Sequence, residues 1–462
     1  MYRIKDGEKK DIILERRYSY NITKEIWIYG LDDDDVFTVN GADRIHSIKL
    51  KIIGGLNNDI YEINNYHNVK VYDQKTKKNT FKTSNIHKKL TDDYKTNTYD
   101  YTKLKNASFL LSPSLGFNPD DGIKVGLKNV ITSNNFERNP FTKQQSISAY
   151  YYFATGGYEL NYYGEFANIL DRWNLGFEAN YNSPNFARNF FGFGNNSNNP
   201  NANIDDGNFD FNRVRIRKFN LGSFVKWRGD LGAQIKIGAS YQNFDVERTP
   251  GRFLETQYAA GNRLFNSKHF FNTEASYFYK HSDNAAFPTL GVEFDSKFGF
   301  TTNLNESRNF SYNKTSLAIT HKLIPSGQLV LASKAKGHFT FGKDFEFYQG
   351  ANIGGNEGLR GYRNERFTGK NSFYHSTDIR WNIRKIKTSF IPLNIVLYGG
   401  FDYGMVWGTP SALTILPNAA SNLNTSYGGG LFFNAANMIV AGIGYFNSAD
   451  GGRLTFDLGF DF

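Results

Sequence analysis

The sequence predicts an all-β protein, a 16-stranded antiparallel transmembrane β-barrel preceded by a small segment of stacked β-rungs. Three observations lead to this fold class. Hydrophobicity alternates with a period of two along most of the chain, as on the two faces of a strand. Many of these alternating segments are about ten residues or longer, enough for a tilted strand to cross a bilayer. Long connections between them alternate with short ones, as in outer-membrane barrels.

The composition agrees with a barrel and excludes helical membrane proteins. The chain has 462 residues and a mean hydropathy of −0.52. It has no apolar run long enough for a transmembrane helix, whereas a barrel strand needs only alternate apolar residues. Aromatic residues make up 16% of the chain, which suits strands and the aromatic girdles of membrane barrels. On composition alone, a soluble all-β protein fits equally well.

Several function classes are excluded by what the sequence lacks. It has no cysteine, so disulfides, thiolate metal sites and cysteine nucleophiles are ruled out. Its net charge is +10, but the basic residues are mixed with acidic ones, so we expect outer-membrane lipid and no nucleic acid as a partner. No nucleophile elbow, phosphate-binding loop or zinc-spaced histidine pair is present. The sequence therefore predicts that this chain is not an enzyme.

The first 74 residues contain an internal repeat. IWIYGLDDDDVFTVNG begins at Ile26 and LKIIGGLNNDIYEINN at Leu50, an offset of 24 residues that matches Ile28 with Ile52. A strand, a turn and a strand repeated at this period predict stacked β-rungs, and residues 69–73 begin a third. We predict three parts: rungs at 1–74, a polar linker at 75–106, and the barrel domain at 107–462.

The turns of the rungs suggest a calcium site. GGLNNDIY resembles the calcium-binding nonapeptide turn, and the neighbouring acidic turn adds oxygen ligands of the kind that calcium prefers. The alternative is that Asp and Asn simply form the turns. The candidate ligands are Asp32, Asp34, Asp35, Asn57 and Asp59.

Period-two alternation continues from about residue 107 to the end of the chain. In WNLGFEANYN, for example, Trp173, Leu175 and Phe177 lie on one face and polar residues on the other. We predict sixteen strands, at residues 106–117, 122–134, 144–154, 157–168, 171–182, 212–228, 231–247, 269–281, 288–301, 309–322, 327–341, 371–384, 393–407, 424–434, 436–447 and 452–462.

The lengths of the connections predict how the barrel is oriented. The long connections, at 183–211, 248–268, 342–370 and 408–423, are all odd-numbered when counted from the first hairpin. Long loops of outer-membrane barrels face outward and short turns face the periplasm. An even number of strands then leaves both ends of the barrel, and the N-terminal segment, in the periplasm.

The sixth outer loop, at 342–370, contains the segment GGNEGLRGYRNERF. Two later strands carry acidic residues that face inward by their phase. In the strand at 371–384, Ile379 and Trp381 belong to the apolar face, which turns Asp378 inward. The same alternation turns Asp402 inward in the strand at 393–407. A buried arginine needs such carboxylate partners.

These motifs resemble the BamA-like bacterial surface-antigen superfamily of outer-membrane barrels, which act in protein insertion or translocation. The resemblance implies that the sixth loop folds into the lumen and that its arginine pairs with acids on the wall. Asp378 stands where the family commonly has glutamate. The residues that match the loop and wall motifs are Leu359, Arg360, Gly361, Tyr362, Asp378, Asp402 and Gly404. The closing strand resembles the family's assembly signal at Phe456, Leu458, Gly459, Phe460 and Phe462, which implies the barrel-assembly machinery as a partner during biogenesis.

The N-terminal part departs from this family, because it lacks the family's βααββ periplasmic repeats. Its rungs are similar to the linker of bacterial chains that carry a calcineurin-like metallophosphoesterase ahead of such a barrel. The metal motifs of that enzyme are not in this sequence, so any phosphoesterase activity is expected in an upstream domain outside this chain. The polar N-terminus has no signal-peptide core, so a leader is expected upstream as well.

Three functions remain open at this stage, all in the outer membrane of a Gram-negative cell envelope. The first is protein insertion or translocation, including export of an upstream domain. The second is a passive porin-like channel, in which lumenal charges set ion preference. The third is a structural anchor for a metallophosphoesterase.

Overall fold

The computed structural model divides into two compact units, Met1–Asn106 with Asn134–Glu137, and Ala107–Ser133 with Arg138–Phe462. No helix in the described part of the chain is long and apolar enough to cross a membrane. The structure describes residues 1–41, 48–64, 67–103, 105–118, 122–197, 199, 209–258, 262–284, 287–342, 344–355, 357–386, 392–410, 422–435 and 439–458.

The N-terminal unit is built from two small parallel sheets between which the chain alternates. A separate hairpin, β1 (Tyr2–Lys5) and β2 (Glu8–Ile12), comes before them. One sheet consists of β3 (Glu25–Tyr29), β5 (Lys49–Ile53), β7 (Val69–Asp73) and β9 (Lys88–Leu90). The other consists of β4 (Val36–Val39), β6 (Ile60–Ile63) and β8 (Thr80–Phe81). Ile28 pairs with Ile52 and Phe37 with Tyr61, which is the predicted 24-residue register.

Equivalent side chains of successive rungs stack inside this unit. The rings of Phe37 and Tyr61 lie 5.3 Å apart, and those of Tyr61 and Phe81 lie 5.0 Å apart, both nearly parallel. Burial of this aromatic column favours the rung register, because a slip of one residue would turn the rings outward. The buried core around it consists of Ile52, Tyr61, Ile63, Val69, Val71 and Ile86.

The predicted linker at 75–106 is wrong. It contains β8, β9 and the short helix α1 (Tyr94–Asn97), and β8 and β9 extend the two parallel sheets. These strands are only two and three residues long, and few of their neighbours point inward. Lysines and threonines on the outside therefore give the segment the composition of a linker.

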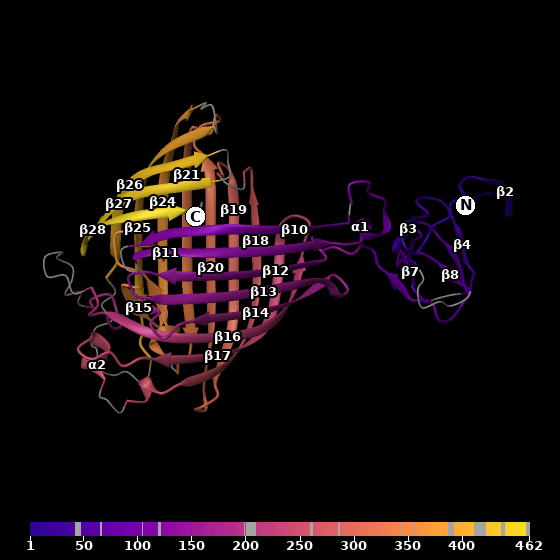
Figure 1. The fold of residues 1–462 in the computed structure, drawn as a ribbon. Coiled ribbons are helices and arrows are strands. Elements are labelled where there is room, and N and C mark those ends of the chain that lie inside the picture. The colour runs from indigo at the N-terminus through magenta and orange to yellow at the C-terminus, as the bar shows by residue number, and fades with distance from the viewer. Residues whose placement is uncertain are drawn as a thin grey trace. The chain divides into compact units, whose positions relative to one another are not determined.

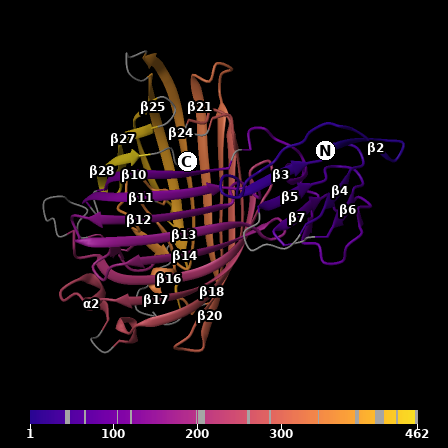
Figure 2. The same ribbon diagram turned by 45° about the vertical axis from the view of Figure 1, so that its right-hand side comes forward.

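The second unit is a nearly closed antiparallel barrel of sixteen long strands, as predicted. Its sheet also includes the short strand β15 (Ala187–Asn189), which was not predicted. Figures 1 and 2 show the strands following one another around the wall, until β28 returns to the vicinity of β10. The long strands are β10 (Asn106–Asn118), β11 (Gly122–Asn134), β12 (Lys143–Tyr152), β13 (Gly157–Leu170), β14 (Trp173–Asn182), β16 (Arg213–Arg228), β17 (Ala233–Val246), β18 (Lys268–Ser282), β19 (Gly291–Asn303), β20 (Arg308–Lys322), β21 (Leu329–Phe341), β24 (Asn371–Ile386), β25 (Leu393–Trp407), β26 (Asn424–Ala435), β27 (Ile439–Ser448) and β28 (Gly451–Leu458).

The two faces of the wall differ as the alternation requires. On β24, Ile379 and Trp381 point outward and are each 52% exposed, whereas Asp378 and Arg380 point inward and are buried. Apolar side chains on the outside would meet lipid, and polar ones line the interior. The wall therefore has the polarity of a membrane barrel, which is the reverse of a soluble one.

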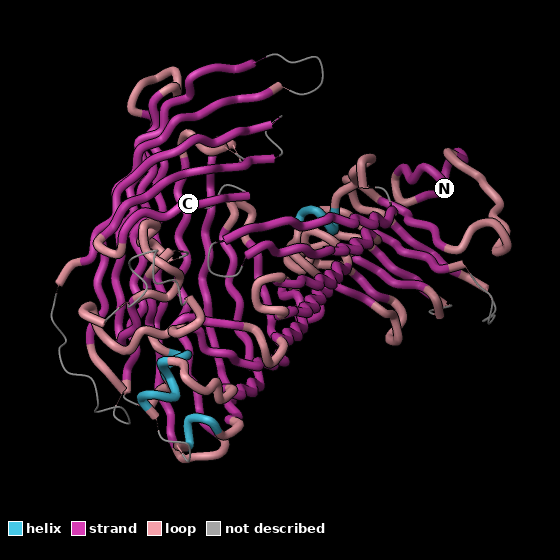
Figure 3. The backbone as a smooth tube through the Cα atoms, turned by 60° about the vertical axis from the view of Figure 1, so that its left-hand side comes forward, coloured by secondary structure: helices cyan, strands magenta, loops and turns pink. Residues whose placement is uncertain are grey.

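Long loops gather at one end of the barrel and fold into secondary structure of their own. They contain α2 (Phe253–Gln257), η2 (Arg263–Phe265), η3 (Phe347–Gln349), β22 (Ala351–Ile353) and β23 (Phe367–Gly369). Their helical turns are cyan in Figure 3. Apolar side chains from these loops pack against apolar inward residues of the neighbouring strands. We call this cluster the loop core, and it consists of Phe190, Phe193, Val214, Ile216, Phe244, Val246, Leu254, Tyr258, Leu264, Phe270, Phe310, Phe345, Phe347 and Tyr348.

Candidate functional site

Arg360 lies in the loop between β21 and β24 and is held by Asp402 of β25. Its backbone amide donates to Asp402 Oδ2 at 3.0 Å, and its side-chain Nη2 donates to Asp402 Oδ1 at 2.6 Å. Nε lies 3.1 Å from each carboxylate oxygen. Ser426 Oγ completes the arrangement by donating to Asp402 Oδ2 at 2.8 Å. Asp402 therefore fixes both the backbone and the side chain of Arg360.

A second carboxylate meets the same guanidinium from the next strand. Arg360 Nη2 lies 2.8 Å from Asp378 Oδ1, and Arg380 Nη2 lies 3.1 Å from Asp378 Oδ2. Asp378 stands opposite Gly400 in the pairing of β24 with β25. A Cβ atom at Gly400 would lie 2.4 Å from Arg360 Nη2, so this glycine leaves the space in which the arginine reaches Asp378.

Because this ion-pair cluster is buried, loss of one partner would leave a charge without solvent or a counter-ion. Asp402 is 0% exposed and Asp378 is 1% exposed, so neither carboxylate is solvated and each needs a partner. Burial by itself would lower the pKa of Arg360, but Asp378 and Asp402 raise that pKa above the ordinary range of arginine. The guanidinium also lies 4.1 Å from the centre of the Phe446 ring. A planar fork can engage two carboxylates at once, which a lysine ammonium cannot do in the same way.

Leu359 and Tyr362 stand close to Arg360 in the sequence, and both side chains are buried. Leu359 is fully buried, and the ring of Tyr362 lies edge-on to that of Phe367 with centres 5.1 Å apart. These side chains anchor the loop through apolar contact as well as charge. The buried cluster they belong to consists of Ile353, Leu359, Tyr362, Phe367, Tyr374 and Val406.

Two predicted glycines mark places where backbones and side chains lie very close together. A Cβ atom at Gly361 would lie 2.8 Å from the carbonyl oxygen of Asn447, and one at Gly404 would lie 2.8 Å from Tyr374 Cβ. Ser448 Oγ donates to the Gly361 carbonyl at 2.8 Å. The loop therefore lies directly against the inner wall, and glycine is required by space at both positions.

Further contacts of the same loop were not predicted. Arg366 Nε lies 2.6 Å from Asp450 Oδ2 between β27 and β28. Glu365 forms an ion pair with Arg188 and accepts from the Asn189 amide at 2.9 Å. The partners of the loop at 342–370 include Arg188 and Asn189 of the predicted loop at 183–211, whereas Asp450 lies in the short connection before the last strand. The only indication of these contacts in the sequence is the density of charged residues in RNERF, at residues 363–367. That density does not identify the partner of any one residue.

The third outer loop also reaches across to this site. The Asn195 side chain donates to the Val406 carbonyl at 2.7 Å and accepts from the Val406 amide at 2.9 Å. The Gly194 amide donates to the Thr368 carbonyl at 2.8 Å. The glycine-rich segment at 189–196 is therefore explained by close packing between two loops.

The predicted assembly signal is only partly described. Phe456 lies on β28, and its ring meets that of Phe117 on β10 edge-on, with centres 5.2 Å apart. Leu458 is the last described residue of β28 and pairs with Ala441. Gly459, Phe460 and Phe462 lie outside the described residues.

The predicted calcium ligands form hydrogen bonds between rungs. Asp59 Oδ1 accepts from the Asp35 amide at 2.8 Å, and Asp34 Oδ1 accepts from the Asn58 amide at 3.1 Å. Asp32 is exposed and Asn57 is half-buried. In the described part of the chain, no group of three or more acidic or histidine side chains is placed to hold a metal ion.

The inner oxygens of this acidic column remain unsatisfied. Oδ2 of Asp35 and Oδ2 of Asp59 are buried without a hydrogen-bond partner. Burial raises the pKa of each to about 6, with further raising by neighbouring carboxylates and, at Asp59, an opposing effect of the hydrogen bond from the Asp35 amide. The geometry suits turn formation, so calcium binding stays a prediction and no chemistry is derived from it.

The fold and the loop site define a class, the outer-membrane β-barrels with a loop held inside the lumen. A family model described as the Omp85 superfamily domain matches residues 154–441. Because this match covers more than half of the chain, the protein belongs to the Omp85 superfamily.

A comparison with solved structures found similar chains, and the first of these has the same overall fold. BamA from Haemophilus ducreyi lacking POTRA domains 1–3 is 15% identical, with a TM-score of 0.55 over 77% of this chain and 70% of that one. CdiB from Escherichia coli is 9% identical, with a TM-score of 0.48 over 76% of this chain and 62% of that one. CdiB from Acinetobacter baumannii is 11% identical, with a TM-score of 0.46 over 79% and 66%. None of the curated proteins compared matches the sequence.

Proposed function

We propose that this chain is a protein-conducting barrel that inserts polypeptides into the outer membrane or exports them across it. The observation that carries the proposal is the sixth loop, which Arg360 fixes inside the lumen through Asp402 and Asp378. A wide passive pore has no need of a buried, charge-locked loop in its lumen. The proposal assigns no catalysis to this chain.

The packing at the loop end argues against a passive channel. The loop core joins buried apolar residues of three loops, such as Phe190, Leu254 and Phe347, to inward residues of the wall, such as Val214 and Phe270. An apolar core of this kind would hinder the passage of water and ions at that position. An ion-selective pore would need polar side chains there instead.

The meeting of the first and last strands supports a seam that opens sideways. The described sheet begins at β10 and ends at β28, and no strand pairing joins these two within the described residues. β10 has 13 residues, whereas the described part of β28 has eight. An edge that is only partly paired presents free backbone groups to another strand. A client strand would use this edge when it enters the membrane.

The orientation and the partners are part of the same proposal. The long connections follow β14, β17, β21 and β25, all at the same end of the barrel, and we assign that end to the cell exterior. The N-terminal unit and both barrel ends are then periplasmic. We further propose that the barrel-assembly machinery recognises the closing strand. Deletion of Phe462 should lower the yield of assembled barrel in cells, and a normal yield would contradict this assignment.

A seam lock tests the proposed function. The chain has no cysteine, so Phe117→Cys with Phe456→Cys introduces the two thiols at the seam, joined by a short bifunctional thiol reagent. The full chain is placed in lipid vesicles, and the insertion rate of a small urea-unfolded barrel protein is measured. We expect that the chain accelerates insertion and that the lock abolishes the acceleration. As a matched control, Tyr277→Cys with Phe294→Cys places two thiols on the neighbouring strands β18 and β19, where the rings of Tyr277 and Phe294 lie 6.1 Å apart. Cross-linking this pair should not change the insertion rate.

The possible outcomes separate the three candidate functions. Acceleration that survives the seam lock would reject the lateral seam. No acceleration, together with steady ion conductance in planar bilayers, would favour the porin-like channel. No acceleration and no conductance would leave the structural anchor, including an anchor for an upstream enzyme domain.

A further inference from the structure

The barrel lumen contains two adjoining cavities, both lined in part by residues of the loop core such as Phe244 and Tyr348. One has a volume of about 360 Å³ and the other about 260 Å³. They share part of their lining, so they form one space with two lobes, which we call the lumenal cavity. The shared residues are Lys218, Phe244, Lys314, His338, Tyr348 and Gln349.

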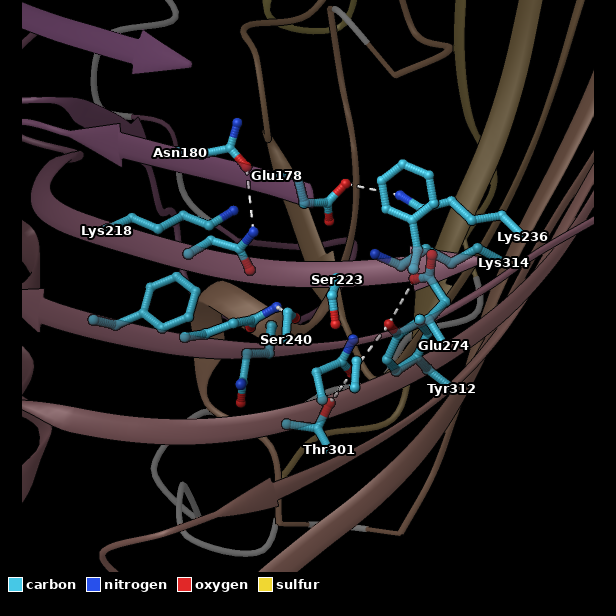
Figure 4. Close-up of a pocket in the computed structure, with 18 of the residues that line it drawn as sticks. Glu178, Asn180, Lys218, Ser223, Lys236, Ser240, Glu274, Thr301, Tyr312 and Lys314 are labelled. Atoms are coloured by element: carbon cyan, nitrogen blue, oxygen red, sulfur yellow. Dashed lines mark hydrogen bonds and ion pairs between the residues drawn. The ribbon is translucent and has the colours of Figure 1, made fainter. Parts of the chain in front are cut away.

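The shared lining contains two lysines and no carboxylate. Lys218 belongs to β16 and Lys314 to β20. Figure 4 shows their side chains extending into the space from opposite sides. Neither lysine forms an ion pair within the described residues, and Lys314 is exposed to the interior of the cavity. Two ammonium groups therefore face a shared, accessible volume.

The other charges of the cavity are largely matched. Lys236 Nζ lies 2.8 Å from Glu178 Oε2, and Lys336 forms an ion pair with Glu357. Glu274 accepts a hydrogen bond from the Tyr312 hydroxyl at 2.8 Å. Glu274 is thus the one carboxylate of the described lining that has no lysine partner, against two such lysines. The space keeps an excess of positive charge.

The remaining wall offers neutral hydrogen-bonding groups. Asn220 donates to Asn180 at 3.2 Å, and Thr301 donates to Asn272 at 2.8 Å. The cavity is also lined by the hydroxyls of Ser223 and Ser240. Amides and hydroxyls of this kind hold the oxygen atoms of a polar solute. Tyr348 and Gln349 of η3 line both lobes of the cavity, and Tyr348 also belongs to the loop core.

We propose that the lumenal cavity binds a small solute through a phosphate group placed between Lys218 and Lys314. Two point charges from opposite sides suit a dianion that carries acceptor oxygens in several directions. The volume suits a small molecule and not a folded chain. The phosphate group can belong to a free phosphorylated solute or to a phospholipid headgroup. This proposal does not depend on the proposed transport function.

Titration of the full chain in zwitterionic detergent tests the site. Calorimetry follows the binding of inorganic phosphate, glycerol phosphate and a short-chain phosphatidic acid in phosphate-free buffer. We expect saturable binding that Lys218→Gln or Lys314→Gln weakens at least tenfold and that the double variant loses. High salt should weaken binding as well, because the attraction is electrostatic.

Two controls separate the site from general charge effects. Lys280 pairs with Glu293 at 2.7 Å and does not line the cavity, so Lys280→Gln removes one charge elsewhere on the barrel. Lys10→Gln with Glu8→Gln removes an ion pair of the N-terminal hairpin that does not line the cavity, and it leaves the net charge of the chain unchanged. Both controls should bind as the original chain does.

Binding of the phosphatidic acid without binding of the free phosphates would assign the group to a lipid headgroup. The reverse would assign it to a soluble solute. An equal loss of affinity in Lys280→Gln, or no saturable binding of any of the three probes, would overturn the proposal. Gel mobility before and after heating verifies that each variant is folded.

Discussion

The two units of this protein both bury aspartates, but they compensate the charge in opposite ways. In the barrel, Asp402 and Asp378 are 0% and 1% exposed and meet the guanidinium groups of arginines. In the N-terminal unit, Asp59 and Asp73 are 1% and 0% exposed. Among the described residues no lysine or arginine pairs with these two. Asp73 instead accepts from the Tyr61 hydroxyl at 2.7 Å.

The difference follows from how each unit is built. In a barrel, a residue on a long loop reaches acids on distant strands, so opposite charges come together. In stacked rungs, the repeat places the same residue type at the same position on each level, so Asp35 comes to lie beside Asp59. The loop that Arg360 holds is therefore most stable when Asp378 and Asp402 are ionised. The acidic column of the rungs is most stable when its carboxyl groups are protonated.

The largest expected effect comes from removing the arginine of the barrel site. Arg360→Ala leaves two buried carboxylates without their shared partner, and breaking such a buried pair costs about 3–5 kcal/mol. We expect the barrel to form but the loop at 342–370 to become accessible to protease. Heat-modifiability on gels and the rate of cleavage within the loop measure the change. Arg360→Lys keeps the charge without the fork and should give an intermediate result.

Protection from protease that is unchanged in Arg360→Ala would show that the loop does not depend on its contacts with Asp402. In that case the apolar cluster around Leu359 and Tyr362 would hold the loop by itself. The paired aspartates of the barrel would then not determine whether the loop stays docked, and the contrast with the N-terminal unit would be lost.

The next effect should be a stabilisation in the N-terminal unit. Burial, opposed by the Asp35 amide and reinforced by nearby carboxylates, raises the pKa of Asp59 to about 6. A raised pKa in the folded state contributes stability that is complete below about pH 4 and is lost as the pH rises through about 6. Asp59→Asn should remove the part of this dependence that comes from Asp59, leaving that of Asp35, and stabilise the unit at pH 7.5 by up to about 3 kcal/mol.

The measurement is the urea midpoint of peptides covering residues 49–64, read by pulsed deuterium labelling at one fixed labelling pH. The original chain should have a higher midpoint at pH 4.5 than at pH 7.5. A midpoint that does not change with pH would reject the protonated column. If added calcium raises the midpoint at pH 7.5 in the original chain but not in Asp59→Asn, calcium binding at these turns would be supported instead.

Much of the barrel was predictable because its signals are local. Period-two alternation identified all sixteen long strands, and every described strand boundary lies within three residues of the prediction. The alternation of inward and outward residues along the strands also predicts that Asp378 and Asp402 lie on the inner face. The resemblance of the loop motif to a family then supplied Arg360 as their partner.

The parts that were missed depend on contacts between distant segments. The third rung has few apolar residues, such as Phe81 and Ile86, so its composition looks like that of a linker. The contacts of Glu365 with Arg188 and of Arg366 with Asp450 join loops that lack any periodic pattern. The charge of each residue was visible in the sequence, but its partner was fixed only by the folding of the loops.

A smaller effect is expected from crowding at the loop site. A Cβ atom at Gly361 would lie 2.8 Å from the Asn447 carbonyl oxygen and 2.9 Å from Ser426 Cβ. Gly361→Ala should therefore lower the stability of the docked loop by about 1–3 kcal/mol, with protease access between those of the original chain and Arg360→Ala. Gly399→Ala is the control, because its nearest neighbour would be 4.0 Å away. Equal effects of the two substitutions would contradict close docking of the loop.

The smallest expected effect separates burial from the mere presence of a carboxylate. Asp34 stands next to Asp35 on the same turn and accepts from the Asn58 amide at 3.1 Å, but its side chain is exposed. Asp34→Asn removes the same charge as Asp59→Asn and keeps an oxygen that can accept the same kind of hydrogen bond. Because water already solvates Asp34, this substitution should change the free energy of unfolding, measured through the urea midpoint at pH 7.5, by less than about 0.5 kcal/mol. A gain as large as that of Asp59→Asn would mean that the total charge of the turn, and not burial of the inner carboxylates, sets the stability of the rungs.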